Sequence, residues 1–288
     1  MGPKISFIVS TFLQMECSST TKYPYFMKFN PPEECTNSIK KQKYKNWEII
    51  YADANSKDGF EARNNAAKKA KGDILFFFCP LSIFTTNNEL NKLLKVFDRT
   101  GADAITCSSI ENDKMGLFKW LIHTELGERE RRMKDSWSDV GCSCYLAIKR
   151  KVFNDVGGFP KKSPTLNTKN RWFNSAFPDW DFTSLLTEKK YKIWHTNKVT
   201  VYHAYRTAFV PYLKKQSHQS GYRVAFHKRF GKFSDDYTKF AFIPPIMTLY
   251  RRTKNKKIFL LIPIVLIRYF SWAFGFIRGH AELLMKKM

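Results

Sequence analysis

Four short runs of β-branched and aromatic residues alternate with helix-like segments in the first part of the chain, at residues 4–12, 46–52, 74–80 and 102–109. The segments between them are polar or rich in alanine and lysine, which suits helices at 35–45, 60–73 and 88–99. A repeated strand–helix–strand order produces right-handed crossovers. The sequence therefore predicts an α/β fold, with a mostly parallel sheet and flanking helices.

Polar or reactive residues follow two of these predicted strands. Asp53 and Asp58 come after the second strand, and Cys79–Leu81 ends the third. The carboxyl ends of parallel strands meet at one edge of a sheet, where ligands bind in open α/β folds. We therefore expect these residues to share one edge although they are distant in sequence.

Two later segments carry local structural signals. The strand-like and helix-like stretch 143–160 contains Gly157 and Gly158, and glycine allows the positive φ of a turn. A further helix is predicted to begin near Asp179 and Asp181, because carboxylates are favourable at a helix N-terminus.

The charge of the chain is strongly positive. Lys and Arg number 49 and Asp and Glu 25, which gives a formal net charge of +24 and a field that attracts phosphates, nucleic acids or anionic lipids. No motif that reads RNA or DNA accompanies the charge, so no nucleic-acid partner is expected. The hydrophobic share of 43% excludes the disordered class.

The cysteines are scattered through a long chain with no secretory peptide before them, so we expect reduced thiols. The segment "GCSC" at 141–144 has one residue between its cysteines and no second pair, which makes it a poor zinc signal. We expect the thiols to be small buried hydrophobic side chains. They are Cys17, Cys35, Cys79, Cys107, Cys142 and Cys144.

The C-terminal part combines apolar and basic residues. The apolar stretch 258–279 is interrupted by Pro263 and Arg268, and an Arg at the centre of a spanning helix costs about 2.5–3.5 kcal/mol. Basic residues flank it on both sides, and both flanks prefer the cytoplasmic face. These features favour a helix that lies in the membrane interface, or a shallow re-entrant hairpin, over a span.

We therefore predict a first domain at 1–235 and a basic, amphipathic, membrane-associated region at 236–288. The expected location is the cytoplasmic face of a membrane, as a peripheral or monotopic protein that contacts anionic lipid. The alternative for the apolar stretch is the core helix of a soluble, cytoplasmic protein.

Several segments together resemble family 2 glycosyltransferases with the GT-A fold. They are "ISFIVSTF", "NSIKKQKYKNWEIIYADANSKDG", "ARNNAAKKAKGDILFF", "KRKVFNDVGGF", "PDWDF" and "YKIWHTNKVTVYHAY", in the family's order and rough spacing over residues 4–230. The resemblance implies a GT-A fold and a nucleoside-diphosphate sugar as donor, most commonly a UDP-sugar.

The resemblance implies nucleotide contacts for four residues. Asp53 and Asp58 match the aspartates of the family's DDGSxDG-like turn, and Arg63 matches its "aRN" segment. Thr11 matches the threonine that ends the first strand, although Ser10 replaces the usual proline beside it. The alternatives are a polar turn capped by Asp58 and a solvated helix charge at Arg63.

The metal-binding aspartates of the family fall on Cys79 and Leu81, with Pro80 between them. Neither a neutral thiol nor leucine suits Mg²⁺ or Mn²⁺, so the usual metal ligands are missing and no metal ligand is assigned. Basic groups must then stabilise the leaving diphosphate. The candidates are Arg63, Lys68, Lys69 and the basic residues between 206 and 229.

Two further carboxylates and a histidine complete the implied site. Asp179 of "PDWDF" matches the family's general base, which takes the proton of the acceptor hydroxyl. Asp181 and His203 match positions near the acceptor or the diphosphate. The alternatives are two carboxylates that stabilise a helix N-terminus and a histidine of the core. Asp73 is expected at the wrong end of its strand to bind a metal.

Three functions remain open at this point. The first is an inverting glycosyltransferase that moves a sugar to a lipid-linked, polysaccharide or glycoprotein acceptor. The second is a non-catalytic GT-A homologue that binds nucleotide sugar or acts as a scaffold for a partner enzyme. The third, a basic binder of nucleic acid or anionic surfaces, rests on net charge alone.

Overall fold

The computed structural model describes residues 2–14, 26–28, 33–53, 59–110, 135–139, 141–160, 178–203, 250–251 and 254–285, together with scattered positions between 213 and 227. The chain divides into two compact units. The first comprises residues 1–112, 130–161 and 178–205, and the second comprises residues 113–129, 162–177 and 206–288. The predicted domain boundary at residue 235 lies outside the described residues and stays a prediction.

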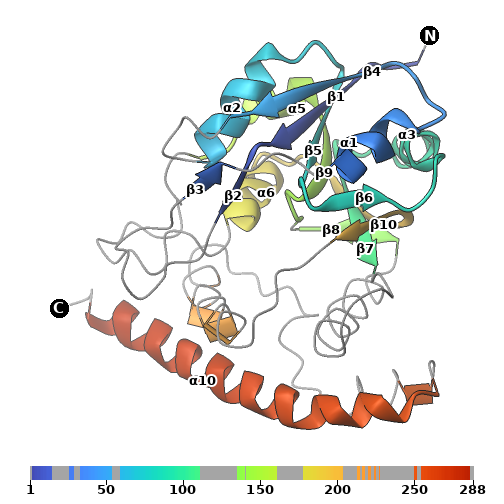
Figure 1. The fold of residues 1–288 in the computed structure, drawn as a ribbon. Helices are drawn as coiled ribbons and strands as arrows, with labels where there is room; N and C mark the ends of the chain where they lie inside the picture. Colours follow the sequence, from blue (N-terminus) through green and yellow to red (C-terminus); the bar gives the residue numbers. More distant parts are fainter. Residues whose placement is uncertain are drawn as a thin grey trace. The chain divides into compact units, whose positions relative to one another are not determined.

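The first unit is built around a mixed β-sheet (Figure 1). Its strands, in spatial order, are β4 (Trp47–Ala52), β1 (Ile5–Ser10), β5 (Ile74–Phe78), β9 (Tyr145–Lys149), β7 (Ala104–Ile110), β10 (Ile193–His203) and β6 (Ser82–Phe84), with β8 (Ser136–Ser138) beside β10. Strands β4, β1 and β5 are parallel to one another, as are β7 and β10. The short strands β2 (Phe12–Gln14) and β3 (Phe26–Lys28) form a separate ribbon.

The expected α/β architecture is confirmed, and β4, β1, β5, β7 and β10 run in the same direction, but the sheet is mixed. Strand β9 runs antiparallel to both of its neighbours, β5 and β7. It begins at Tyr145 opposite Phe78, the last residue of β5, and so enters the sheet from the carboxyl edge. The sequence pattern did not reveal this reversal, because a buried strand has the same apolar composition in either direction.

Helices cover both faces of the sheet, which explains why β5 is apolar throughout. Successive side chains of a strand point to opposite faces. Phe76 and Phe78 therefore pack with the residues of α1 (Glu33–Lys40) and α3 (Glu89–Thr100), whereas Leu75 and Phe77 pack with α2 (Gly59–Lys69), α5 (Arg150–Val156) and α6 (Pro178–Glu188). The helices predicted at 60–73, 88–99 and near Asp179 are confirmed within a few residues.

The predicted glycine turn holds α2 in place. Gly157 and Gly158 have φ values of 88° and 77°, which glycine adopts without the strain that other residues meet. A Cβ on Gly158 would lie 2.7 Å from Oδ1 of Asn64. Asn64 accepts a hydrogen bond from the Phe159 amide and donates one to the Phe159 carbonyl, at 2.9 and 2.8 Å. This pair fixes α2 beside the turn and so positions Arg63, the residue before Asn64.

The second unit contains one long apolar helix, α10 (Leu261–Met285), preceded by the 3₁₀ turn η1 (Lys256–Leu260). Among the described residues, the stretch Lys256–Ala281 is long and apolar enough to cross a membrane. Length and composition alone do not distinguish such a helix from a core helix.

Small residues allow α10 to pack closely on Ser217, Ser220 and Gly221 of the same unit. A Cβ on Gly275 would collide with the Ser217 carbonyl, and one on Gly279 would lie 2.8 Å from the Gly221 carbonyl oxygen. The Ser220 hydroxyl donates to the Trp272 carbonyl at 2.6 Å. Gly275 and Gly279 thus form a small-residue face of the kind that lets helix backbones approach each other.

Candidate active site

The carboxyl ends of β1, β4 and β5 lie side by side, as the sequence predicts. Ser10 pairs with Ala52, and Val9 pairs with Phe78, so Ser10, Asp53 and Cys79 follow one another along this edge. Thr11 joins two of these strands, because its amide and hydroxyl both donate to the Ala52 carbonyl, at 2.9 and 3.1 Å. Asp53 is exposed beside this junction. Asp58 lies outside the described residues.

Arg63 links the strand ends to the first turn of α6. Its Nε donates to the Ser10 hydroxyl at 3.2 Å, and its Nη1 donates to the Ser143 hydroxyl at 2.9 Å. Ser143 in turn donates a short hydrogen bond to Oδ1 of Asp179. The serine that replaces the family's proline at position 10 therefore holds Arg63, and the predicted residues Arg63 and Asp179 belong to one network.

Asp179 is partly buried in this network, and its environment changes its acidity. Burial, followed by the negative charge of Cys144, raises the pKa of Asp179 to about 6, against the opposing effects of Arg63 and Ser143. A carboxylate with such a pKa is ionised at neutral pH and is a stronger base than an ordinary aspartate. The side chain can therefore accept a proton from a bound hydroxyl group.

The other two predicted site residues differ in exposure and contacts. Asp181 is fully buried within α6, away from solvent. His203 ends β10 and is nearly buried, with its Nδ1 2.9 Å from the Ser82 hydroxyl. Ser82 itself belongs to β6, which pairs with β10 at this point.

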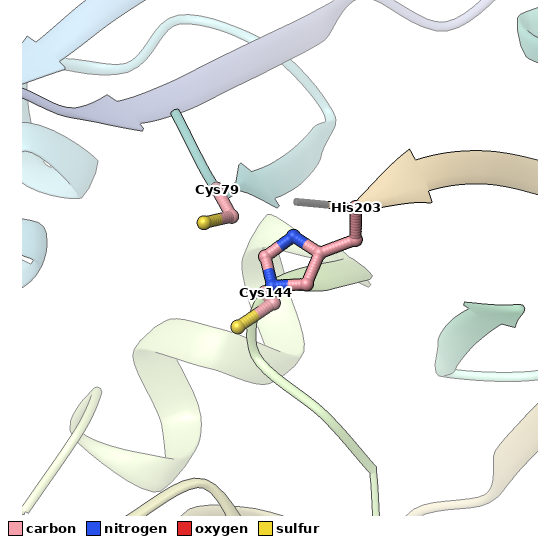
Figure 2. A group of neighbouring side chains, drawn as sticks. All are labelled: Cys79, Cys144 and His203. Atoms are coloured by element: carbon pink, nitrogen blue, oxygen red, sulfur yellow. The ribbon is translucent and has the colours of Figure 1, made fainter. Parts of the chain in front are cut away.

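His203 lies next to two cysteines that come from different parts of the chain (Figure 2). The Cys79 amide donates to the Cys144 carbonyl at 2.7 Å, which brings the residue after β5 against the residue before β9. Donor atoms of Cys79, Cys144 and His203 all lie within 4.8 Å of one another, and a second group of the same kind contains Cys142, Cys144 and Asp179. Both groups share Cys144.

The cysteines of this edge are not equivalent. Hydrogen bonds from the thiols of Cys142 and Cys79, together with the charges of His203 and Arg63, hold the pKa of the Cys144 thiol well below its usual range. The hydrogen bond with Cys144 and burial raise the pKa of Cys79. Cys144 is thus the thiol that carries negative charge most readily.

Sequence reasoning missed this grouping. The prediction of small buried hydrophobic side chains is confirmed for Cys35, Cys79 and Cys107, but Cys79 also forms a group with Cys144 and His203 that the sequence did not indicate. The sequence places Cys79 at the end of a predicted strand, and the resemblance places His203 near the diphosphate or acceptor, but neither signal joins the two residues. The partner Cys144 could not be added, because the antiparallel entry of β9 was not foreseen.

Two other predictions concern the opposite edge of the sheet. Asp73 accepts a hydrogen bond from the Lys4 amide at 2.8 Å, at the amino ends of β1 and β5, which confirms that it is at the wrong end for this site. Lys68 and Lys69 are exposed in the last turn of α2. The residues that directly follow this helix contact the same amino ends of the strands. The prediction that these two lysines stabilise a diphosphate at the carboxyl edge is therefore wrong.

No protein-family model matches the chain, nor does any curated protein. The mannosyltransferase PcManGT from Pyrobaculum calidifontis, solved in complex with GDP-Man and Mn²⁺, matches over 99% of this chain and 88% of its own, with 15% identity and a TM-score of 0.54. TarS from S. aureus matches over 95% of this chain and 54% of its own, with 14% identity and a TM-score of 0.46. The likeness to PcManGT shows the shared fold, so the GT-A architecture expected from the sequence is confirmed.

Proposed function

We propose that the chain is an inverting glycosyltransferase that uses a nucleoside-diphosphate sugar. The observation that carries this proposal is the network from Ser10 through Arg63 and Ser143 to Asp179, at the edge of the sheet where α/β folds bind ligands. This network holds a permanent cation, Arg63, and a carboxylate that can act as a base, Asp179, within one site.

Asp179 acts as the general base in this proposal. The acceptor hydroxyl oxygen attacks the anomeric carbon of the donor sugar, its proton passes to the Asp179 carboxylate, and the diphosphate leaves with the electron pair of the broken C–O bond. The Ser143 hydroxyl bonds Oδ1 of Asp179 and so fixes the orientation of the carboxylate.

Arg63 stabilises the leaving diphosphate. A guanidinium stays charged at all relevant pH values and forms two parallel hydrogen bonds to phosphate oxygens. Its bonds to Ser10 and Ser143 hold the side chain in position before a ligand arrives, and a preorganised charge is the most effective kind in catalysis. Thr11, Asp53 and Asp58 are the proposed contacts to the nucleotide.

The GT-A fold also raises the question of Mg²⁺ or Mn²⁺, since PcManGT was solved with Mn²⁺. The donor atoms that gather at this edge are three thiols, an imidazole and a single carboxylate, that of Asp179, which is engaged with Ser143. These do not fit a hard cation that prefers oxygen ligands. No step of the proposed reaction is therefore assigned to such an ion.

The acceptor is proposed to be presented at a membrane surface with anionic lipid, on its cytoplasmic face. The exposed side of α10 carries large apolar side chains, among them Phe270, Phe274 and Ile277 at 78%, 64% and 68% exposure. Exposed basic residues precede the helix at Arg251, Lys256 and Lys257. An apolar helix face with basic flanks suits a helix that lies on anionic lipid, and a lipid-linked or polysaccharide acceptor fits this location.

One observation favours a second function, a nucleotide-sugar-binding scaffold without catalysis. Cys79 and Leu81 occupy the positions where the resemblance implies metal-binding aspartates. A chain that has lost these groups can keep the fold and the nucleotide contacts while it loses the reaction.

Nucleotide binding tests the proposal first. We expect isothermal titration of the purified chain with UDP, a UDP-sugar and GDP-mannose to show binding of at least one ligand in the presence of EDTA. Asp53→Ala should weaken that binding by about 10- to 150-fold, because a charged hydrogen-bond partner is worth about 1.5–3 kcal/mol. Asp98→Asn, at an exposed position of α3, is the matched control and should leave binding unchanged.

Three outcomes separate the candidate functions. Binding that is followed by sugar transfer in an acceptor screen supports the enzyme. Binding without transfer to any acceptor, from lipid phosphates to polysaccharides, supports the scaffold. The absence of binding to all nucleotide sugars contradicts both.

A further inference from the structure

The group formed by Cys79, Cys144 and His203 has the composition of a site for a borderline-soft metal. Two thiols and one imidazole are ligands that zinc accepts and that Mg²⁺ and Mn²⁺ do not prefer. Figure 2 shows the two sulfur atoms and the imidazole ring around the same space, although the residues come from the ends of three different strands.

The spacing of the donor atoms suits one ion. Zinc binds sulfur at about 2.3 Å and nitrogen at about 2.0–2.1 Å, which places two sulfur ligands of a tetrahedral site about 3.8 Å apart. The donor atoms of this group lie within 4.8 Å of one another. Closing them on an ion thus requires shifts of about 1 Å, within reach of side-chain rotation.

The backbone fixes the positions of all three residues. The Cys79 amide bonds the Cys144 carbonyl at 2.7 Å, and the Ser82 amide bonds the Cys79 carbonyl at 2.9 Å. Ser82 pairs in turn with His203 across β6 and β10. The three residues therefore belong to one hydrogen-bonded frame rather than to separate loops.

The hydroxyl of Ser82 also orients the imidazole. It lies 2.9 Å from Nδ1 of His203, and in the tautomer that donates the Nδ1 proton to this oxygen the ring carries its lone pair on Nε2, the atom that would bind an ion. Histidines that bind metals usually carry such a hydrogen bond on the other ring nitrogen, because it fixes the tautomer and the ring orientation.

We propose that Cys79, Cys144 and His203 bind a zinc-class divalent cation at the carboxyl edge of the sheet. The site has three protein ligands, which leaves the fourth tetrahedral position for water or an anionic ligand, as in catalytic rather than structural zinc sites. Asp179 is engaged with Ser143 and is not among the three ligands. This inference does not depend on sugar transfer, because a scaffold would bind the ion equally well.

Cobalt titration of the full-length chain tests the site. The protein is purified and kept anaerobic, stripped of metal with a chelator and titrated with Co²⁺. We expect one equivalent to give a thiolate-to-cobalt charge-transfer band and intense visible bands of tetrahedral Co²⁺, both of which Zn²⁺ removes. Cys79→Ser, Cys144→Ser and His203→Gln should each weaken Co²⁺ binding by at least tenfold.

The matched control uses a buried cysteine outside the group. Cys107→Ala should leave the Co²⁺ spectrum and affinity unchanged, since this thiol does not belong to the group, whereas the Cys35 thiol donates to the Cys79 carbonyl and is not used as a control. Circular dichroism of each variant shows whether it is folded. X-ray absorption of the zinc-loaded wild type needs no variant, and it should show two sulfur neighbours and at least one nitrogen neighbour.

Three results would overturn the inference. The first is a folded, reduced wild-type chain that gives no thiolate band with Co²⁺. The second is a band that persists unchanged in both Cys79→Ser and Cys144→Ser. The third is a disulfide between Cys79 and Cys144, found by mass spectrometry in protein that was purified anaerobically. None of these measurements involves a nucleotide, so failure of the metal site and failure of the proposed function are distinguishable.

Discussion

The neighbours of Asp179 shift the pKa of its carboxyl group in opposite directions. Burial and the charge of Cys144 raise its pKa, whereas Arg63 and the Ser143 hydroxyl favour the carboxylate. Ser143 was not predicted from the sequence, because a serine in "GCSC" carries no signal until α6 is placed against it. Arg63 was predicted from the sequence, but Ser143, which connects it to Asp179, was found only in the structure.

Replacement of Asp179 tests its role directly. Asp179→Asn keeps the shape of the side chain but removes the base, so we expect sugar transfer to fall on the order of 10²–10⁴-fold. Titration with the same nucleotide sugar should give an unchanged affinity, since the residue acts on the acceptor. If Asp179→Asn transferred sugar at the wild-type rate, Asp179 would not be the general base.

Secondary-structure elements were predicted well where the pattern was local. The aromatic run of β5 and the alanine-rich α2 appear within a few residues of the predicted bounds. The positions of these elements relative to the two edges of the sheet were predicted less well. Lys68 and Lys69 were expected near the site, but α2 starts beyond the carboxyl edge and runs back along the sheet, so its last turn lies at the other end.

Glu48 connects three elements at the amino edge of the sheet. Its carboxylate accepts hydrogen bonds from the Ser6 hydroxyl at 2.6 Å, the Lys71 amide at 2.7 Å and the Lys4 ammonium at 3.1 Å. Burial alone would raise the pKa of Glu48, but these three bonds outweigh it and the pKa is lowered. The ionised form therefore stabilises the folded state.

This lowered pKa predicts a pH dependence of stability. A group whose pKa is lower in the folded state contributes stability above its unfolded pKa and loses it as the pH falls through the folded pKa. We expect Glu48→Gln to lower the melting temperature at pH 7 and to reduce the loss of stability on acidification. The exposed Glu188→Gln on α6 is the control and should match wild type. If the melting temperatures of Glu48→Gln and wild type fell by the same amount between pH 7 and pH 3, this role of Glu48 would be contradicted.

At the scale of the whole molecule, the sequence separated an α/β part from an apolar C-terminal part. The GT-A fold was predictable because collinear segments such as "PDWDF" appear in order, even though none is decisive alone. The packing of α10 was not predictable in the same way. Gly275 and Gly279 have the four-residue spacing that puts small residues on one face of a helix, but this signal does not name the partner segment, and Ser217 and Gly221 were identified only in the structure.

Membrane binding is the prediction that belongs to this scale. One side of α10 is occupied by its packing on Ser217, Ser220 and Gly221, so its large exposed apolar side chains lie on the remaining surface. We expect the chain to sediment with vesicles that contain phosphatidylserine, more weakly with neutral vesicles, and less at high salt. Each Lys or Arg near an anionic surface contributes about 1 kcal/mol, and salt screens that contribution.

Substitutions on the exposed face separate this interaction from attraction by net charge. Phe270→Ser and Phe274→Ser should each reduce vesicle binding by about tenfold or more, because about 1.5–3 kcal/mol accompanies full burial of a large apolar side chain. Ala273→Ser, an exposed small residue of the same helix, is the matched control and should bind as wild type does. If the Phe variants bind vesicles as tightly as wild type, the basic residues alone account for binding. If the chain ignores vesicles but sediments as a dimer that the same Phe substitutions dissociate, this face binds a second copy of the chain and the proposed membrane contact is wrong.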